Sequence, residues 1–118
     1  MAVDFLKGAE ASAAPLISPW RYIPAMPTYV MLSTLTPEGV QTIKSNPARI
    51  REVNKELEQL GVTVKAQWAV LGRYDFVNVI EAPDEKTVAR VSMELGSRGT
   101  ARYETLTAIP VDDFIAAL

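Results

Sequence analysis

The stretch that decides the fold is residues 62–81, VTVKAQWAVLGRYDFVNVIE. Its first half alternates apolar and polar positions, which is the period of a strand with one drier face. Its second half, Tyr74 to Glu81, predicts another strand, in which Phe76 to Ile80 is apolar on both faces except at Asn78. Gly72 lies between the halves and permits a turn, so we expect an antiparallel hairpin. The drier face of the first strand is expected to consist of Val62, Val64, Ala66, Trp68 and Val70.

The segment before this hairpin predicts a strand followed by a helical region. Thr28 to Leu35 is rich in β-branched and aromatic residues, as strands are. Thr36-Pro37 and Ser45-Asn46-Pro47 are both helix-start signals, since each pairs a capping residue with a proline at the first helical position. We therefore expect the first helix to be broken or kinked near Pro47.

The segment after the hairpin predicts a helix, a strand and a short final helix. A helix is expected from Pro83 to Gly96, a fourth strand from Thr100 to Ile109, and a short helix after Pro110. The sequence thus predicts an α+β domain of the ferredoxin-like βαββαβ type over residues 26–118. Its four-stranded antiparallel sheet is expected to have the order 4-1-3-2, with both helices on one face.

The other face of this sheet is expected to be apolar. Whichever way the third strand is turned, either Phe76 and Ile80 or Val77 and Val79 point away from the helices. Monomers rarely leave large apolar patches uncovered. We expect a second copy of the chain to cover this face, because isologous dimers are the commonest oligomers. The alternative is that the C-terminal helix folds across it.

Composition excludes several classes of function. The 118 residues carry a formal net charge of −2 and contain neither cysteine nor histidine. This removes disulfides, thiolate nucleophiles, the usual zinc ligands and Ser-His-Asp triads, so no metal or cofactor is expected. There is no basic excess for nucleic acid and no apolar run long enough to span a membrane. No signal peptide is recognised, and a cytoplasmic location is expected.

At Gly72-Arg73-Tyr74-Asp75-Phe76-Val77 the chain resembles the GYD domain family, and the resemblance covers about residues 26–114. Further matching segments are Pro27-Thr28-Tyr29-Val30, Thr36-Pro37-Glu38-Gly39, Glu81-Ala82-Pro83-Asp84 and Thr105-Leu106-Thr107-Ala108-Ile109. The resemblance implies an α+β sandwich and, for a family without an established activity, no particular chemistry.

The residues of this cluster have a structural interpretation and a functional one. Asp75 can accept hydrogen bonds from local backbone N–H groups and cap the turn, and Tyr74 offers an aromatic ring with a polar tip. Alternatively, Arg73, Tyr74 and Asp75 line a small polar or anionic pocket at the hairpin. A small-anion sensor at Arg73 or Arg98 is a further, weaker option.

A second group of candidate ligand-binding residues surrounds Asn78. If Asn78 and Trp68 share the open face of the sheet, they would, together with Lys65 and Tyr103, place polar groups in an apolar cavity of roughly 300 Å³ or more. Such a cavity would suit a small ligand or a cofactor-independent, oxygenase-like enzyme. The simpler interpretation is that Asn78 bonds a cross-strand neighbour such as Lys65, Gln67 or a threonine.

Residues 1–25 form a proline- and alanine-rich extension that we expect to dock on another surface. Its anchors are Trp20, Arg21, Tyr22 and Ile23, which are flanked by prolines that lower the cost of ordering. The favoured function is therefore a non-catalytic, oligomeric accessory or scaffold domain that self-associates through its sheet and docks a larger protein partner through this extension.

Overall fold

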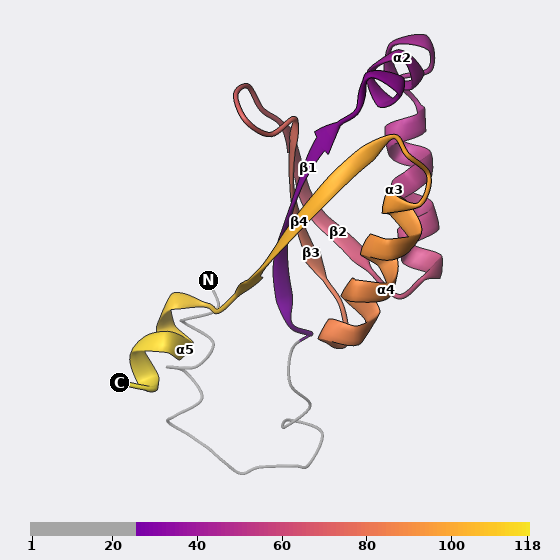
Figure 1. Ribbon diagram of the computed structural model, residues 1–118. Helices are drawn as coiled ribbons and strands as arrows, with labels where there is room; N and C mark the ends of the chain where they lie inside the picture. Colours follow the sequence, from indigo (N-terminus) through magenta and orange to yellow (C-terminus); the bar gives the residue numbers. More distant parts are fainter. Residues whose placement is uncertain (1–25) are drawn as a thin grey trace. The chain divides into compact units, whose positions relative to one another are not determined.

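The computed structural model describes residues 26–118 (Figure 1). The predicted docking segment, with Trp20, Arg21, Tyr22 and Ile23, lies outside the described residues. Residues 26–108 form one compact unit, and residues 109–118 belong to a second one. The two are described separately below.

The first unit is built on a four-stranded antiparallel sheet. Its strands are β1 (Thr28–Leu35), β2 (Thr63–Ala69), β3 (Phe76–Glu81) and β4 (Ala101–Ala108). They are arranged β2-β3-β1-β4, which is 4-1-3-2 when read from the opposite edge. The strand predicted to be apolar on both faces, β3, is one of the two central strands, and β1 is the other.

The helices confirm the predicted break at Pro47. The first helical region divides into α2 (Pro37–Ser45) and α3 (Arg49–Gln59), and α4 (Glu85–Gly96) follows β3. Thr36 caps α2 by accepting a 3.1 Å hydrogen bond from the Gly39 N–H. Gly39 itself packs so closely on β4 that an added Cβ would overlap the carbonyl oxygen of Thr100. α3 and α4 lie on the same side of the sheet (Figure 1).

The helices cover one face of the sheet, which we call the covered side, and the hydrophobic core lies between that face and the helices. Tyr29 and Met31 supply it from β1, and Ile80 supplies it from β3. The other buried members of the cluster are Leu57, Val62, Ala82, Val88, Val91 and Leu95. Because Tyr29, Met31 and Ser33 are buried at alternate positions of β1, Val30 and Leu32 lie on the opposite face.

An irregularity in β2 changes which residues share a face. Val64 lies opposite Ile80 and Ala66 lies opposite Val79, so Lys65 is an extra residue between two consecutive partners of β3. Such a bulge reverses the facing of the residues that follow it. The predicted single face from Val62 to Val70 is therefore wrong: Val64 faces the helices, whereas Ala66 and Trp68 face away.

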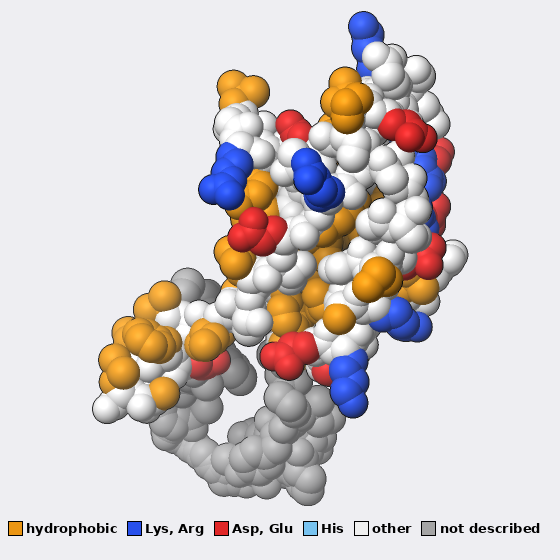
Figure 2. Space-filling view, viewed as in Figure 1, with side chains coloured by type: hydrophobic (Ala, Val, Ile, Leu, Met, Phe, Trp, Pro, Cys, Tyr) orange, Lys and Arg blue, Asp and Glu red, His pale blue; other side chains and the backbone are white. Residues whose placement is uncertain are grey.

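The second unit contains α5 (Val111–Ala116), the short C-terminal helix that the sequence predicts. Its segment carries exposed apolar side chains, which Figure 2 shows gathered together: Ile109, Val111, Phe114, Ile115 and Leu118. Among residues 26–118, no helix combines the length and the apolar content needed to cross a bilayer.

Candidate functional site

The open face of the sheet is the first candidate site. Val30 lies between Val79 and Leu106 on the neighbouring strands, and Leu32 lies beside Val77, which in turn pairs with Trp68. Trp68 and Leu106 are 55% and 47% exposed. Of the two predicted alternatives, Val77 and Val79 are thus the pair that points away from the helices. We define the open face as Val30, Leu32, Trp68, Val77, Val79 and Leu106.

Charged residues of both signs border this open face. Glu104 lies opposite Leu32 on β4, and Arg102 lies opposite Thr34. The exposed Lys65 is at the bulge of β2 on the other edge. The open face therefore has an apolar centre and a charged rim, as protein interfaces do.

The GYD cluster, from Gly72 to Asp75, stabilises the edge of the sheet at which β1 ends and β3 begins. Gly72 has a φ of 117°, a backbone conformation that favours glycine. Asp75 Oδ2 accepts a 2.7 Å hydrogen bond from the Leu35 N–H, and the Asp75 N–H donates to the Ser33 carbonyl at 2.8 Å. The prediction that Asp75 caps its own turn is therefore wrong in its partner, because the carboxylate bonds the end of β1 instead.

The neighbours of Asp75 lie on the outside of the sheet. The Tyr74 hydroxyl donates a 2.7 Å hydrogen bond to Glu104 Oε1, and this bond raises the pKa of the Tyr74 phenol. The Arg73 guanidinium lies 5.7 Å from the centre of the Tyr74 ring. Neither Arg73, Tyr74 nor Asp75 lines the cavity described next.

A cavity of about 180 Å³ lies on the covered side, between the sheet and the helices. It is smaller than the predicted one and lies on the opposite face. In the space-filling view, hydrophobic side chains are visible in the hollow between β4 and α4 (Figure 2). The apolar residues lining the cavity are Met31, Leu35, Ile43, Ile50, Val53, Leu57, Phe76, Leu95 and Ala101.

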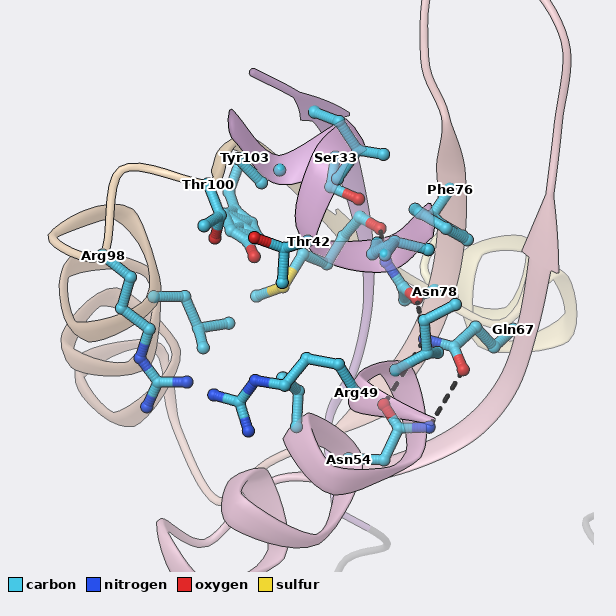
Figure 3. A pocket seen from close by; sticks show the side chains of 18 of the residues that line it. Ser33, Thr42, Arg49, Asn54, Gln67, Phe76, Asn78, Arg98, Thr100 and Tyr103 are labelled. Carbon is cyan, nitrogen blue, oxygen red and sulfur yellow. Dashed lines mark hydrogen bonds between the residues drawn. The ribbon is translucent and has the colours of Figure 1, made fainter. Parts of the chain in front are cut away.

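One wall of the cavity is a chain of three amides (Figure 3). Asn54 Nδ2 donates to Gln67 Oε1 at 2.9 Å, and Gln67 Nε2 donates to Asn78 Oδ1 at 2.8 Å. Asn78 Nδ2 then donates to the Met31 carbonyl at 2.9 Å. The buried Asn78 is thus satisfied by a cross-strand neighbour and by the backbone of β1, as a buried amide requires.

Four residues with hydroxyl groups also line the cavity: Ser33, Thr42, Thr100 and Tyr103. Ser33 and Tyr103 are direct cross-strand partners, and both line the cavity. Neither side chain has a hydrogen-bond partner within residues 26–118. Burial raises the pKa of the Tyr103 phenol, an effect that the charge of Arg98 opposes.

The charged residues lining the cavity are both cationic. Arg49 from α3 and Arg98, just beyond α4, direct their guanidinium groups toward each other (Figure 3). Glu56 bridges them: Arg49 Nη1 donates to Glu56 Oε2 at 2.9 Å, and Arg98 Nη1 donates to Glu56 Oε1 at 2.6 Å. Hydrogen bonds from Arg49 and then Arg98 lower the pKa of Glu56.

The structure separates the predicted ligand residues. Asn78 and Tyr103 line the cavity, but Lys65 and Trp68 do not. The expectation that Asn78 and Trp68 share the open face is wrong, because Trp68 pairs with Val77 and Gln67 pairs with Asn78. Sequence reasoning also missed Ser33, Arg49 and Asn54, whereas Gln67 was predicted as a possible partner of Asn78 and bonds it. Asn54 carried a signal, since it follows Ile50 by four residues and so falls within the apolar stripe of its helix.

The fold and its surfaces define a small α+β protein with a sheet face that the helices of residues 26–108 leave uncovered and a compact, partly polar cavity beneath those helices. The model of the GYD domain matches residues 29–118, and the chain belongs to this family, as its sequence resemblance indicates. The chain is also 60% identical, over 94 residues, to a Thermus thermophilus protein named "Glutamine synthetase and cystathionine beta-lyase binding protein". The match covers 79% of this chain and 99% of that protein. No solved structure matches the chain significantly.

Proposed function

We propose that this protein is a non-catalytic accessory protein that binds metabolic enzymes, and that it does so as a self-associated assembly of ferredoxin-like domains. The observation that carries this proposal is the 60% identical relative, whose name describes a protein that binds glutamine synthetase and cystathionine β-lyase. Enzymes of these two kinds are the partners that we propose for this chain.

The open face supplies the surface for self-association. Trp68 and Leu106 lie on its two edge strands, β2 and β4, and are half exposed, and a large aromatic anchor such as Trp68 can contribute much of the energy of an interface. An isologous interface must be complementary to itself. The rim meets this condition, because Arg102 and Glu104 offer both signs of charge on a single strand. We therefore assign a second copy of the chain to the open face.

In this proposal the N-terminal extension strengthens the contact with the enzyme partner, adding to a binding surface on the domain, because the match to the relative covers 79% of this chain but 99% of that protein. Trp20, Tyr22 and Ile23 are large anchors, and Arg21 adds a charge-assisted donor. An extended proline-containing segment that binds in a groove loses less conformational entropy than a flexible one. Separating the two surfaces would let one assembly hold an enzyme on each extension.

The test uses the full-length chain and its substituted forms, with purified glutamine synthetase and cystathionine β-lyase from the same organism. Binding is measured by surface plasmon resonance, and assembly mass is measured by analytical ultracentrifugation. Trp20→Ala/Ile23→Ala should weaken enzyme binding at least tenfold and leave the mass unchanged. Trp68→Ser/Leu106→Ser should instead lower the mass.

Leu71→Ser is the matched control, because Leu71 is fully exposed at the hairpin but does not belong to the open face. Leu71→Ser removes a large apolar side chain, as the open-face substitutions do, and should change neither the binding of the enzymes nor the mass of the assembly. The proposal fails for the partner if neither enzyme binds the full-length chain. It fails for the open face if the parent protein sediments as a monomer.

A further inference from the structure

We propose that the cavity beneath the helices is a binding site for a small organic acid, whose carbon body fills the apolar part and whose carboxylate lies at Arg49 and Arg98. This inference is independent of the proposed binding of enzymes. It rests on the size of the cavity, on the charges that line it and on the hydrogen-bonding groups that face it.

The size and the lining fit a ligand of about six to eight non-hydrogen atoms. The cavity measures about 180 Å³, and an engineered cavity of about 150 Å³ holds one benzene molecule. Aliphatic side chains and Phe76 make up nearly half of the lining residues. A short carbon chain or a ring would bury its apolar surface there, and each methylene removed from water contributes favourably.

The charged side chains that line the cavity are two arginines, and an anionic group is the ligand that guanidinium donors bind. The bridge to Glu56 occupies Nη1 of both arginines. Two more carboxylates lie outside the cavity lining, at 3.3 Å from Glu52 Oε1 to Arg49 Nη1 and at 3.5 Å from Glu94 Oε2 to Arg98 Nη2. Within residues 26–118, Arg49 Nη2 and the Nε atoms of both arginines have no hydrogen-bond partner. A guanidinium offers five donors, so a second carboxylate can bind beside Glu56.

The polar wall gives the ligand further contacts. The hydroxyls of Ser33 and Tyr103 line the cavity without a partner among the described residues. Neither hydroxyl is among the buried polar atoms left without a partner, so both can bond a solvent molecule or a ligand in the cavity. They would hydrogen-bond the acid or a second polar group on its carbon body. The amide chain from Asn54 to Asn78 keeps this wall fixed in place.

The test compares two probes of equal size on the full-length protein. Hexanoate and hexanamide each have eight non-hydrogen atoms and differ in charge. Both are titrated into isotope-labelled protein while the side-chain amide signals of Asn54 and Gln67 are followed by NMR. We expect saturable shifts of these signals with hexanoate and an affinity at least tenfold lower with hexanamide.

Variants on one helix separate a binding role from a structural one. Arg49→Gln should remove the preference for hexanoate over hexanamide. Arg51→Gln, two residues further along α3 on an exposed position outside the cavity, should leave it unchanged. Glu56→Gln should tighten hexanoate binding several-fold, because it removes a competing carboxylate and frees arginine donors. A purely structural bridge would not produce this rise in affinity.

Three outcomes would overturn the proposal. The first is equal binding of hexanoate and hexanamide. The second is the absence of a saturable shift with hexanoate at about 10 mM, the range of a very weak site. The third is weaker hexanoate binding by a folded Glu56→Gln variant. If Arg49→Gln does not fold, Tyr103→Phe replaces it, and its affinity for hexanoate should fall several-fold with the fold intact.

Discussion

Replacing Asp75, the aspartate of the GYD cluster, tests how the hairpin is attached to the sheet. The ladder between β1 and β3 ends at Ser33 opposite Phe76. Beyond that pair the chain turns away into the hairpin, and the Asp75 carboxylate takes over by accepting the Leu35 N–H at 2.7 Å. Asp75→Ala should leave this N–H without a protein partner.

The expected loss follows from the bond that is removed. A hydrogen bond to a charged group contributes about 1.5–3 kcal/mol, and a half-buried site reduces this value because water replaces part of the bond. We expect Asp75→Ala to lower the free energy of unfolding by about 1–2 kcal/mol. Asp75→Asn keeps an acceptor oxygen without the charge and should cost about half as much.

The assay is urea unfolding followed by circular dichroism, together with thermal unfolding. Each kcal/mol should lower Tm by about 4 °C in a chain of this size. Tyr74→Phe is the matched control, since it removes the exposed hydrogen bond to Glu104 and should have a much smaller effect than Asp75→Ala. Equal effects of Asp75→Ala and Tyr74→Phe would refute the reasoning, because the carboxylate would then contribute no more than a surface contact.

Three further predictions concern the packing and the charges of the covered side. Gly39→Ala should cost about 1–3 kcal/mol by denaturant unfolding, because its Cβ overlaps a backbone carbonyl, whereas Gly96→Ala, which meets no atom within 4 Å, should be neutral or stabilising. Glu56→Gln should cost about 1 kcal/mol or less at pH 7, since the Glu56 side chain is 36% exposed. The lowered pKa of Glu56 means that its contribution is present above the ordinary glutamate pKa and is lost as pH falls through the lowered one, so this difference from the parent should vanish at pH values below the lowered pKa. Tyr103→Phe should remove a late step from the ultraviolet alkaline titration, because burial raises the pKa of that phenol; an unchanged titration would contradict the burial of its hydroxyl.

The order of elements was predictable because each signal was local. Thr36-Pro37 and Pro47 mark two helix starts, and the structure begins α2 and α3 at or near them. The two apolar faces of the β3 sequence identify a central strand. Such features depend on residues close together in the chain, so one sequence is enough to read them.

The cavity was not predictable in the same way. Its polar wall depends on the bulge at Lys65, which brings Gln67 opposite Asn78 and turns Trp68 to the other side. Nothing in the alternating pattern of β2 indicates where an extra residue interrupts the pairing. The approach of Arg49 to Arg98 likewise depends on how α3 and α4 pack, and 49 positions separate these residues in the chain.

The extra residue in β2 also affects how copies of this protein can meet. An unbroken outer strand offers a row of free N–H and C=O groups on which another chain can continue the sheet. In β2 the bulge at Lys65 interrupts that row and places a cation in it. Extension of the sheet into a fibril through the β2 edge is therefore disfavoured. Open-ended association of copies, edge strand to edge strand, is therefore disfavoured at β2.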